Sequence, residues 1–135
     1  MCSEEQQIQV KLGRRYKAYA AETGVSYRYF FEAQRRVVRP EGQGAGCDYT
    51  FVVSPGQGPP FTLKVFVSER ALAAWRQAHG RELDSGEEYA AAKMRLFRAF
   101  DARERLVEER LNLVVDETNV EELLEPLNFA DPSKC

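Results

Sequence analysis

The clearest alternation of hydrophobic and polar residues in this chain lies in residues 61–67, FTLKVFV. Hydrophobic residues at nearly every second position place one side of this segment against a core, which predicts a half-buried β-strand. Ser68 then offers a side-chain oxygen to the first turn of a helix over residues 69–79, and Gly80 suits the left-handed position that ends many helices. Trp75, the only tryptophan, lies on the apolar face of this helix. We expect Trp75 to be buried against the strand.

Two further strands are predicted before this unit. Residues 47–53 alternate in the same way, and residues 25–38 are rich in aromatic and β-branched residues. The latter segment also fits a helix that begins at Ser26, but its composition favours a long strand. Segments rich in glycine and proline at residues 39–46 and 54–60 are typical of loops between neighbouring strands. The three strands therefore predict an antiparallel meander.

The first segment of the chain, residues 4–22, carries a pattern that fits two structures. Hydrophobic residues at helical intervals favour a helix near residues 5–21: Ile8, Leu12, Tyr16 and Tyr19. A short strand over residues 8–12 ahead of a helix is the alternative, because hydrophobic and polar residues alternate there.

A long helix is predicted near residues 86–105. Ser85 and Glu88 have the spacing of a capping box, in which two side chains satisfy free amides at the start of a helix. Hydrophobic residues follow on one face, with Lys93 inside the apolar stripe. Pairs of opposite charge four residues apart extend the predicted helix beyond residue 104.

The C-terminal segment combines a strand pattern with a helical one. Hydrophobic residues alternate over residues 110–115, which can form a fourth strand. Thr118 and Glu121 have the spacing of another capping box, and the short helix that they open ends before Pro126. Residues 131–135 are predicted to be a flexible tail.

Together these elements predict an α+β fold, in which a three- to four-stranded antiparallel meander sheet is packed by helices. The predicted order is α-β-β-β-α-α, and a β-α pair can follow at the C-terminus. One domain over residues 1–130 accounts for nearly the whole chain, and it is long enough to bury a hydrophobic core.

The composition is that of a globular protein, with 44% hydrophobic and 30% charged residues. No run approaches the roughly 18 apolar residues that a membrane-spanning helix needs. The acidic, polar start of the sequence differs from a secretory signal. Three cysteines, two of them near the chain ends, make neither a disulfide framework nor a zinc motif. These features predict a cytoplasmic protein without membrane association or a bound metal.

Charge is distributed unevenly along the chain. Residues 1–100 contain 15 Lys and Arg against 11 Asp and Glu, whereas residues 101–135 contain 4 against 10. An acidic end of this kind is found in docking tails. A solvated helix with surface salt bridges gives the same imbalance, and we favour that interpretation while the docking tail stays open.

The sequence contains no recognisable catalytic set. His79 is the only histidine, and we expect it to pack near the end of a helix. Cys47, at the start of a predicted strand, is expected to lie in the core or a loop. Four other charged residues can form a site only if the fold brings them together: Glu22, Glu32, Lys93 and Asp101. We therefore predict a non-enzymatic protein without a cofactor.

By elimination, the expected function is that of a protein-binding module or an accessory subunit, with self-association as a related expectation. The candidate partner-binding surface is an apolar stripe on the predicted C-terminal helix: Val120, Leu123, Leu124 and Leu127. So short a helix is not stable alone in water. The stripe therefore packs either on its own domain or in the groove of a partner.

The alternative function is binding of RNA or single-stranded DNA. Six cationic residues occur near aromatic residues in the first 39 positions: Arg14, Arg15, Lys17, Arg35, Arg36 and Arg39. Such cations bind phosphates, and exposed aromatic rings stack on bases. The sequence pI of about 5.6 disfavours this alternative, because nucleic-acid-binding domains are usually basic.

Overall fold

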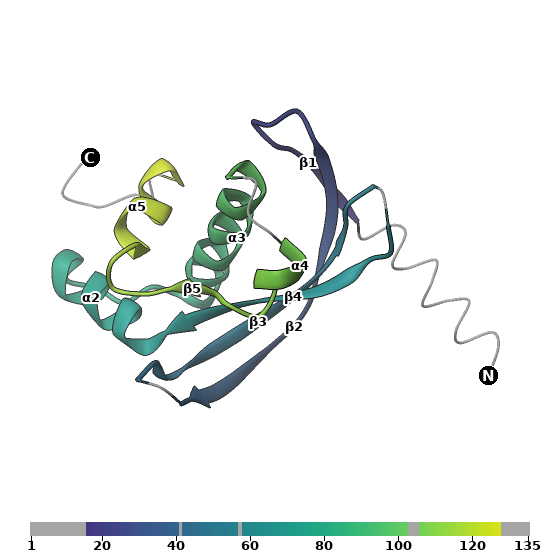
Figure 1. The fold of residues 1–135 in the computed structure, drawn as a ribbon. Coiled ribbons are helices and arrows are strands. Elements are labelled where there is room, and N and C mark those ends of the chain that lie inside the picture. The colour runs from purple at the N-terminus through teal and green to yellow at the C-terminus, as the bar shows by residue number, and fades with distance from the viewer. Residues whose placement is uncertain (1–15, 41, 57, 103–105, 128–135) are drawn as a thin grey trace, which may run out of the picture.

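The computed structural model describes residues 16–40, 42–56, 58–102 and 106–127. Its centre is a five-stranded sheet in which the strands lie in the same order as in the sequence (Figure 1). The strands are β1 (Lys17–Ala20), β2 (Ser26–Arg39), β3 (Gly44–Ser54), β4 (Phe61–Ser68) and β5 (Leu113–Val115). Strands β1 to β4 form an antiparallel meander, and β5 pairs with β4 in parallel.

The α+β class is confirmed, but the sheet differs from the predicted three- to four-stranded antiparallel meander. β1 adds an unpredicted strand at one edge. β5 lies within the segment in which a fourth strand was considered, but it runs parallel to β4. A parallel neighbour needs a long connection that crosses back over the sheet, and the helices between β4 and β5 supply it.

The predicted helix near residues 5–21 is wrong over residues 17–20, which form β1. There Tyr19 lies opposite Tyr27 of β2 in antiparallel register. Helical spacing of hydrophobic residues is a local signal, and a tertiary contact overrides it here, because the Tyr19 ring stacks on Phe97 from the second half of the chain. Residues 4–15, which include the alternative strand, lie outside the described residues.

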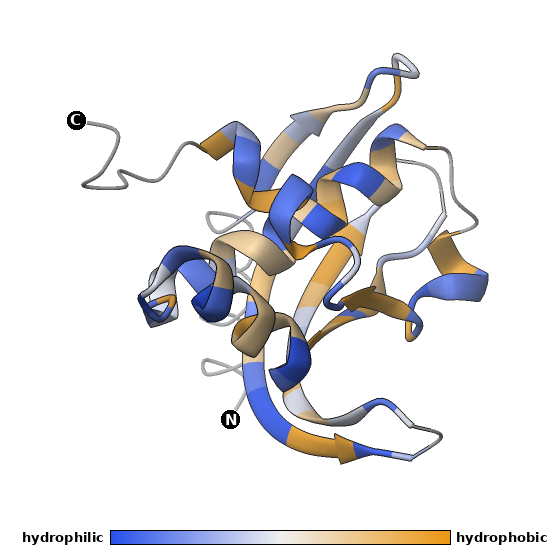
Figure 2. Cartoon of the chain, turned by 90° about the vertical axis from the view of Figure 1, so that its left-hand side faces the viewer, coloured by the Kyte–Doolittle hydropathy of each residue, from blue (hydrophilic) through white to orange (hydrophobic). Residues whose placement is uncertain are grey.

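β2 is a strand, as its composition indicated, but a β-bulge divides it. Its pairing register with β3 shifts between Phe31 and Ala33, where β2 has one extra residue. Strict alternation would place Phe31 and Arg35 on the same face, and the bulge instead puts them on opposite faces. Residues 32–36 are all exposed, and Figure 2 shows this part of β2 as a hydrophilic stretch ahead of a hydrophobic tip.

The described helices lie on one side of the sheet (Figure 1), which we call the covered face. They are α2 (Glu69–His79), α3 (Ser85–Asp101), α4 (Leu106–Glu109), α5 (Val120–Leu124) and the 3-10 helix η1 (Glu125–Leu127). The main core lies between them and the sheet, and its largest fully buried side chains include Tyr49, Phe51, Leu63, Leu96 and Phe100. The opposite side, the open face, carries side chains of Arg28, Phe30, Arg35, Asp48, Lys64 and Phe66.

The unit formed by β4 and α2 confirms its prediction. The Ser68 hydroxyl accepts a hydrogen bond from the Ala71 amide at 3.1 Å, and Gly80 ends α2 in the left-handed conformation with φ of 75°. Trp75 is only 4% exposed and belongs to the same core cluster as β4.

Two predicted helix caps need correction. The capping box of α3 consists of Asp84 and Glu87, one residue before Ser85 and Glu88. Both pairs have the same spacing, so the sequence alone does not distinguish them. Thr118 does not cap α5, whose cap position is Asn119.

Candidate binding pocket

The edge strand β1 runs alongside α3, and the segment that begins with β1 contacts this helix through aromatic rings and two hydrogen bonds. The rings of Tyr19 and Phe97 stack with centroids 4.1 Å apart. The Tyr19 hydroxyl donates a hydrogen bond to Asp101 Oδ2 at 2.7 Å, and the backbone amide of Glu22 donates to Asp101 Oδ1 at 3.0 Å. Both carboxylate oxygens of Asp101 are therefore held in place by the β1 side.

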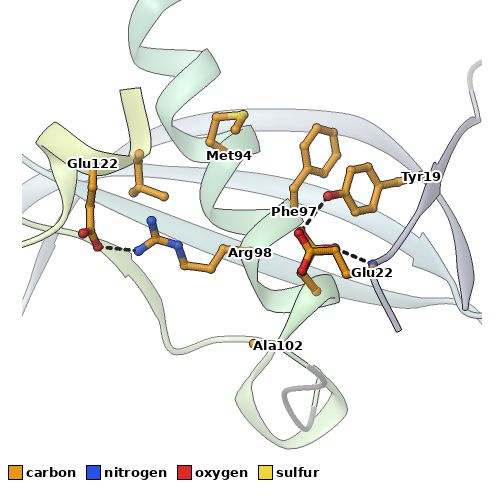
Figure 3. A pocket seen from close by; sticks show the side chains of 9 residues that line it. Tyr19, Glu22, Met94, Phe97, Arg98, Ala102 and Glu122 are labelled. Carbon is orange, nitrogen blue, oxygen red and sulfur yellow. Dashed lines mark hydrogen bonds and ion pairs between the residues drawn. The ribbon is translucent and has the colours of Figure 1, made fainter. Parts of the chain in front are cut away.

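A surface pocket of about 390 Å³ lies beside these contacts, between β1, α3 and α5. We call it the α3–α5 pocket. Met94, Phe97 and Leu123 give it an apolar floor. Figure 3 shows Tyr19 and Glu22 at one end of the pocket and Glu122 at the other, with Arg98 turned toward Glu122. The pocket thus combines hydrophobic side chains with charged groups at both ends.

The charges around the pocket are not balanced. Arg98 and Glu122 form an ion pair of 2.9 Å, in which both side chains remain substantially exposed. Glu22 and Asp101 form no ion pair with any described residue. One end of the pocket is therefore locally neutral, and the other end presents two carboxylates.

Tyr19 acts in the pocket as a hydrogen-bond donor. Burial and the hydrogen bond to Asp101 raise the pKa of Tyr19 to about 12. The phenol therefore keeps its proton near neutral pH, where it orients the carboxylate and does not serve as a base. This arrangement can hold a ligand that has both an aliphatic part and a positive charge. The aliphatic part would pack on the apolar floor, and the positive charge would pair with the carboxylates of Asp101 and Glu22.

The predicted partner-binding stripe lies mostly inside the domain. Val120, Leu123 and Leu124 are 1–3% exposed and belong to the main core, whereas Leu127 is 37% exposed. Of the two arrangements that the spacing allowed, the structure has the one in which the stripe packs on its own domain. Leu123 reaches the surface only as part of the pocket floor.

The predicted nucleic-acid-binding residues that the structure describes do not form one surface. Arg35 is exposed on the open face, whereas Arg36 points to the covered side and pairs with Glu69. Arg39 is engaged by Asp48 at 2.8 Å. Lys17 shares the side of β1 that faces α3, and Arg14 and Arg15 lie outside the described residues.

The other candidate residues are engaged by their neighbours or buried. His79 stacks on Trp75 and lies 2.6 Å from Glu121. Cys47 is buried, and this burial raises the pKa of its thiol. Burial and the nearby Lys17 ammonium lower the pKa of Lys93, whose ammonium lies 5.5 Å from the centre of the Tyr89 ring.

A second hollow of about 610 Å³ lies at the end of the sheet, near the loop between β3 and β4. Tyr27, Phe61 and Val107 are among its mostly apolar lining residues, and Glu108 is its single charged one. It offers contact area but few polar groups that would select a ligand. We therefore regard the α3–α5 pocket as the better candidate site.

No three His, Cys, Asp or Glu side chains within the described residues are grouped so that they could hold a metal ion. Among the described helices, none is long and apolar enough to cross a membrane.

Comparison with known proteins identified no relative: no family model, curated protein or solved structure matches the chain. The pocket must therefore be interpreted from its own geometry.

The sequence pattern pointed to parts of this site without assembling it. Glu22 and Asp101 were two of four charged residues considered as a group, and the fold does bring these two together. The role of Tyr19 was missed, because its partner Asp101 is 82 positions away and no local pattern links them.

Proposed function

We propose that this chain is a non-enzymatic protein-binding module, an accessory subunit that holds a basic side chain of its partner in the α3–α5 pocket. The observation that carries the proposal is an apolar floor next to two carboxylates that lack a cationic partner among the described residues. Lysine and arginine side chains have the matching form, because a charged group ends an aliphatic stem.

The orientation of Asp101 supports this proposal. Its carboxylate is fixed by the Tyr19 hydroxyl and the Glu22 amide before any ligand arrives. A preformed acceptor loses less conformational freedom on binding than a mobile one. Each oxygen has a second lone pair, so a ligand ammonium can bind without breaking either hydrogen bond.

The floor of the pocket supplies the second part of the recognition. Met94 lies between the charged ends, and its flexible thioether side chain adapts to ligands of different shape. An aliphatic stem laid across Met94, Phe97 and Leu123 removes apolar surface from water. A small cation without such a stem would gain only the electrostatic contact.

The proposal can be tested through Met94 itself. The chain contains two methionines, Met1 and Met94, so labelling with ¹³C-methyl methionine gives one signal in the pocket and one at the terminus. We expect the peptide acetyl-Gly-Gly-Lys-Gly-Gly-amide to shift the Met94 signal in a saturable way. The matching peptide with glutamate should shift it far less.

Variants separate the pocket from general surface charge. Glu22→Gln removes a carboxylate at the rim, and we expect the lysine peptide to bind the variant a few-fold, about two- to fivefold, more weakly. Glu117→Gln removes an exposed carboxylate outside the pocket and is the matched control. No saturable Met94 shift with either a lysine or an arginine peptide would refute the proposed function.

A further inference from the structure

The open face of the sheet has its own chemistry, independent of the α3–α5 pocket. Two aromatic side chains on it, Phe30 and Phe66, are buried but lie outside the main core cluster. The guanidinium of Arg39 lies 4.6 Å from the centre of the Phe66 ring and binds Asp48. This part of the open face is therefore closed and locally neutral.

Three other cations of the open face have no acidic partner among the described residues: Arg28, Arg35 and Lys64. Arg28 and Arg35 are exposed, and Lys64 is half-buried. Asp48 is the acidic residue whose strand register places it on this face, and Arg39 already engages it. An exposed glutamate, Glu32, lies at the bulge. Asp116 and Glu117 line a hollow with Phe66 and Arg70 at the β5 end of the sheet. Within the described part of the open face, the unpaired positive charge is therefore concentrated at Arg28, Arg35 and Lys64.

Arg28 is held in position on this face. Its guanidinium lies 4.9 Å from the centre of the Tyr16 ring, and Tyr16 contacts Phe30 edge-on with centroids 5.0 Å apart. Stacking on a ring limits the freedom of the side chain and leaves its donors directed to solvent. Arg28 is thus a pre-positioned cation at one end of the face.

The geometry points to a phosphate-binding surface: we propose that the open face binds the sugar–phosphate backbone of a single-stranded nucleic acid. Arg28 and Arg35 lie on the same strand, seven positions apart with the bulge between them, which corresponds to roughly 20 Å. Lys64 lies two strands away, opposite Thr50 of β3, which in turn pairs with Ala33 of β2. The three cations thus follow an extended path that a strand with several phosphates can contact.

The burial of the phenylalanine rings indicates that a nucleic acid would bind this face through its phosphates rather than through its bases. Phe30 is 4% exposed and Phe66 is fully buried, so neither ring offers a free surface on which a base can stack. The half-buried Tyr16 ring is already contacted by Arg28 and Phe30. A protein partner would need large apolar anchors at the centre of its interface, and the two phenylalanine side chains described on this face are buried. Contacts with phosphates alone predict binding that is weak, insensitive to base sequence and strongly dependent on salt.

The surface differs from the one that the sequence suggested. Arg36 and Lys17 face the covered side, and Arg39 is engaged by Asp48. Arg35 belongs both to the set predicted from the sequence and to the set on the open face. Lys64 of β4 belongs only to the second set, because the pairing of β4 with β3 brings it onto this face.

Fluorescence anisotropy of labelled oligo-dT and oligo-U with the full-length chain tests the proposal. Three phosphate contacts predict a log–log salt slope of about −2 for a single strand, so affinity should fall about 20-fold between about 50 and 200 mM salt. Arg35→Gln should reduce the steepness of the slope by about 0.7. The triple variant Arg28→Gln, Arg35→Gln, Lys64→Gln should lose binding.

Arg76→Gln, on the exposed side of α2, is the matched control and should leave the slope unchanged. Circular dichroism checks that each variant is folded. Absence of binding at low salt, or full binding by the folded triple variant, would overturn the proposal. Equal competition by poly-glutamate would also overturn it, because the surface would then accept any acidic chain rather than a phosphate backbone.

Discussion

The two faces of the sheet are built from the same strands and differ in what covers them. On the covered face, Phe51 and Leu63 are fully buried under helices, and the groups that carry the proposed function lie at its edge. On the open face, Phe30 and Phe66 are also buried, but arginine and tyrosine side chains contribute to their cover. The alternation of hydrophobic and polar residues along β3 and β4 predicts that the sheet has two different faces. It does not indicate which face the helices pack against.

This difference separates structural residues from candidate functional ones. A buried ring under a helix belongs to the core, and its loss should destabilise the fold. An exposed cation beside a buried ring can be removed at little cost to stability and is free to contact a ligand. The following predictions test that division, from the largest expected effect to the smallest.

The largest effect is expected for Trp75. Trp75→Ala removes a side chain that is 4% exposed, and we expect a loss of about 3–5 kcal/mol in the free energy of unfolding. Urea unfolding followed by circular dichroism measures it. Val38→Ala, at a site that is 78% exposed, is the control and should change stability by less than about 0.5 kcal/mol. Similar losses in both variants would contradict the assignment of the core.

Gly46 tests how closely the open face is packed. A Cβ atom at this position would lie 2.5 Å from both the Phe66 ring and the Val67 carbonyl oxygen. We therefore expect Gly46→Ala to cost about 1–3 kcal/mol. Gly86→Ala, in a roomy helical position, should be neutral or slightly stabilising. A folded Gly46→Ala variant with unchanged stability would show that the Phe66 ring does not lie over Gly46.

Two ion pairs compare the faces directly. Arg39 and Asp48 on the open face are 17% and 12% exposed, whereas Arg98 and Glu122 at the pocket are 40% and 62% exposed. Double-mutant cycles should give a coupling energy of about 1–3 kcal/mol for the first pair and about 0–1 kcal/mol for the second. The reverse order would mean that the Arg39 pair is solvated in solution.

Alkaline pH should weaken the covered face. Burial and hydrogen bonds to carboxylates raise the pKa values of Tyr19, to about 12, and of Tyr49, whose hydroxyl lies 2.8 Å from Glu88. Above pH 10 the unfolded chain releases these protons while the folded chain retains them, so stability is present below pH 10 and is lost as the pH rises. Urea unfolding at several pH values should show a shallower decline for Tyr49→Phe than for the wild type. Identical slopes would contradict this role of Tyr49.

Local structure was predictable where one segment contained all the information. Ser68, the alternation of β4 and Gly80 lie within 20 residues, and the strand, helix and caps follow from them. The first segment failed because residues 17–20 gain their structure from β2 and α3 rather than from their own pattern. The alternation of hydrophobic and polar residues gave no sign of the bulge after Phe31. The bulge nevertheless determines on which face of the sheet every later side chain of β2 lies.

The candidate site was less predictable than the fold. Its carboxylates come from the turn after β1 and the end of α3, and Glu22 and Asp101 are 79 positions apart. A single sequence gives no information on which distant side chains meet. It also left open whether Val120, Leu123 and Leu124 pack on their own domain or on a partner, because an amphipathic stripe looks the same in both cases.

The most direct test of the central claim reverses one charge at the pocket. In the wild type, the Met94 methyl signal should respond more strongly to a lysine peptide than to the same peptide with norleucine, which keeps the aliphatic stem without the charge. In Glu22→Lys, the added ammonium lies beside Asp101 and neutralises the anionic end, so the two peptides should become equivalent. A lysine preference that persists in Glu22→Lys, or no preference in the wild type, would contradict recognition of a basic side chain by this pocket.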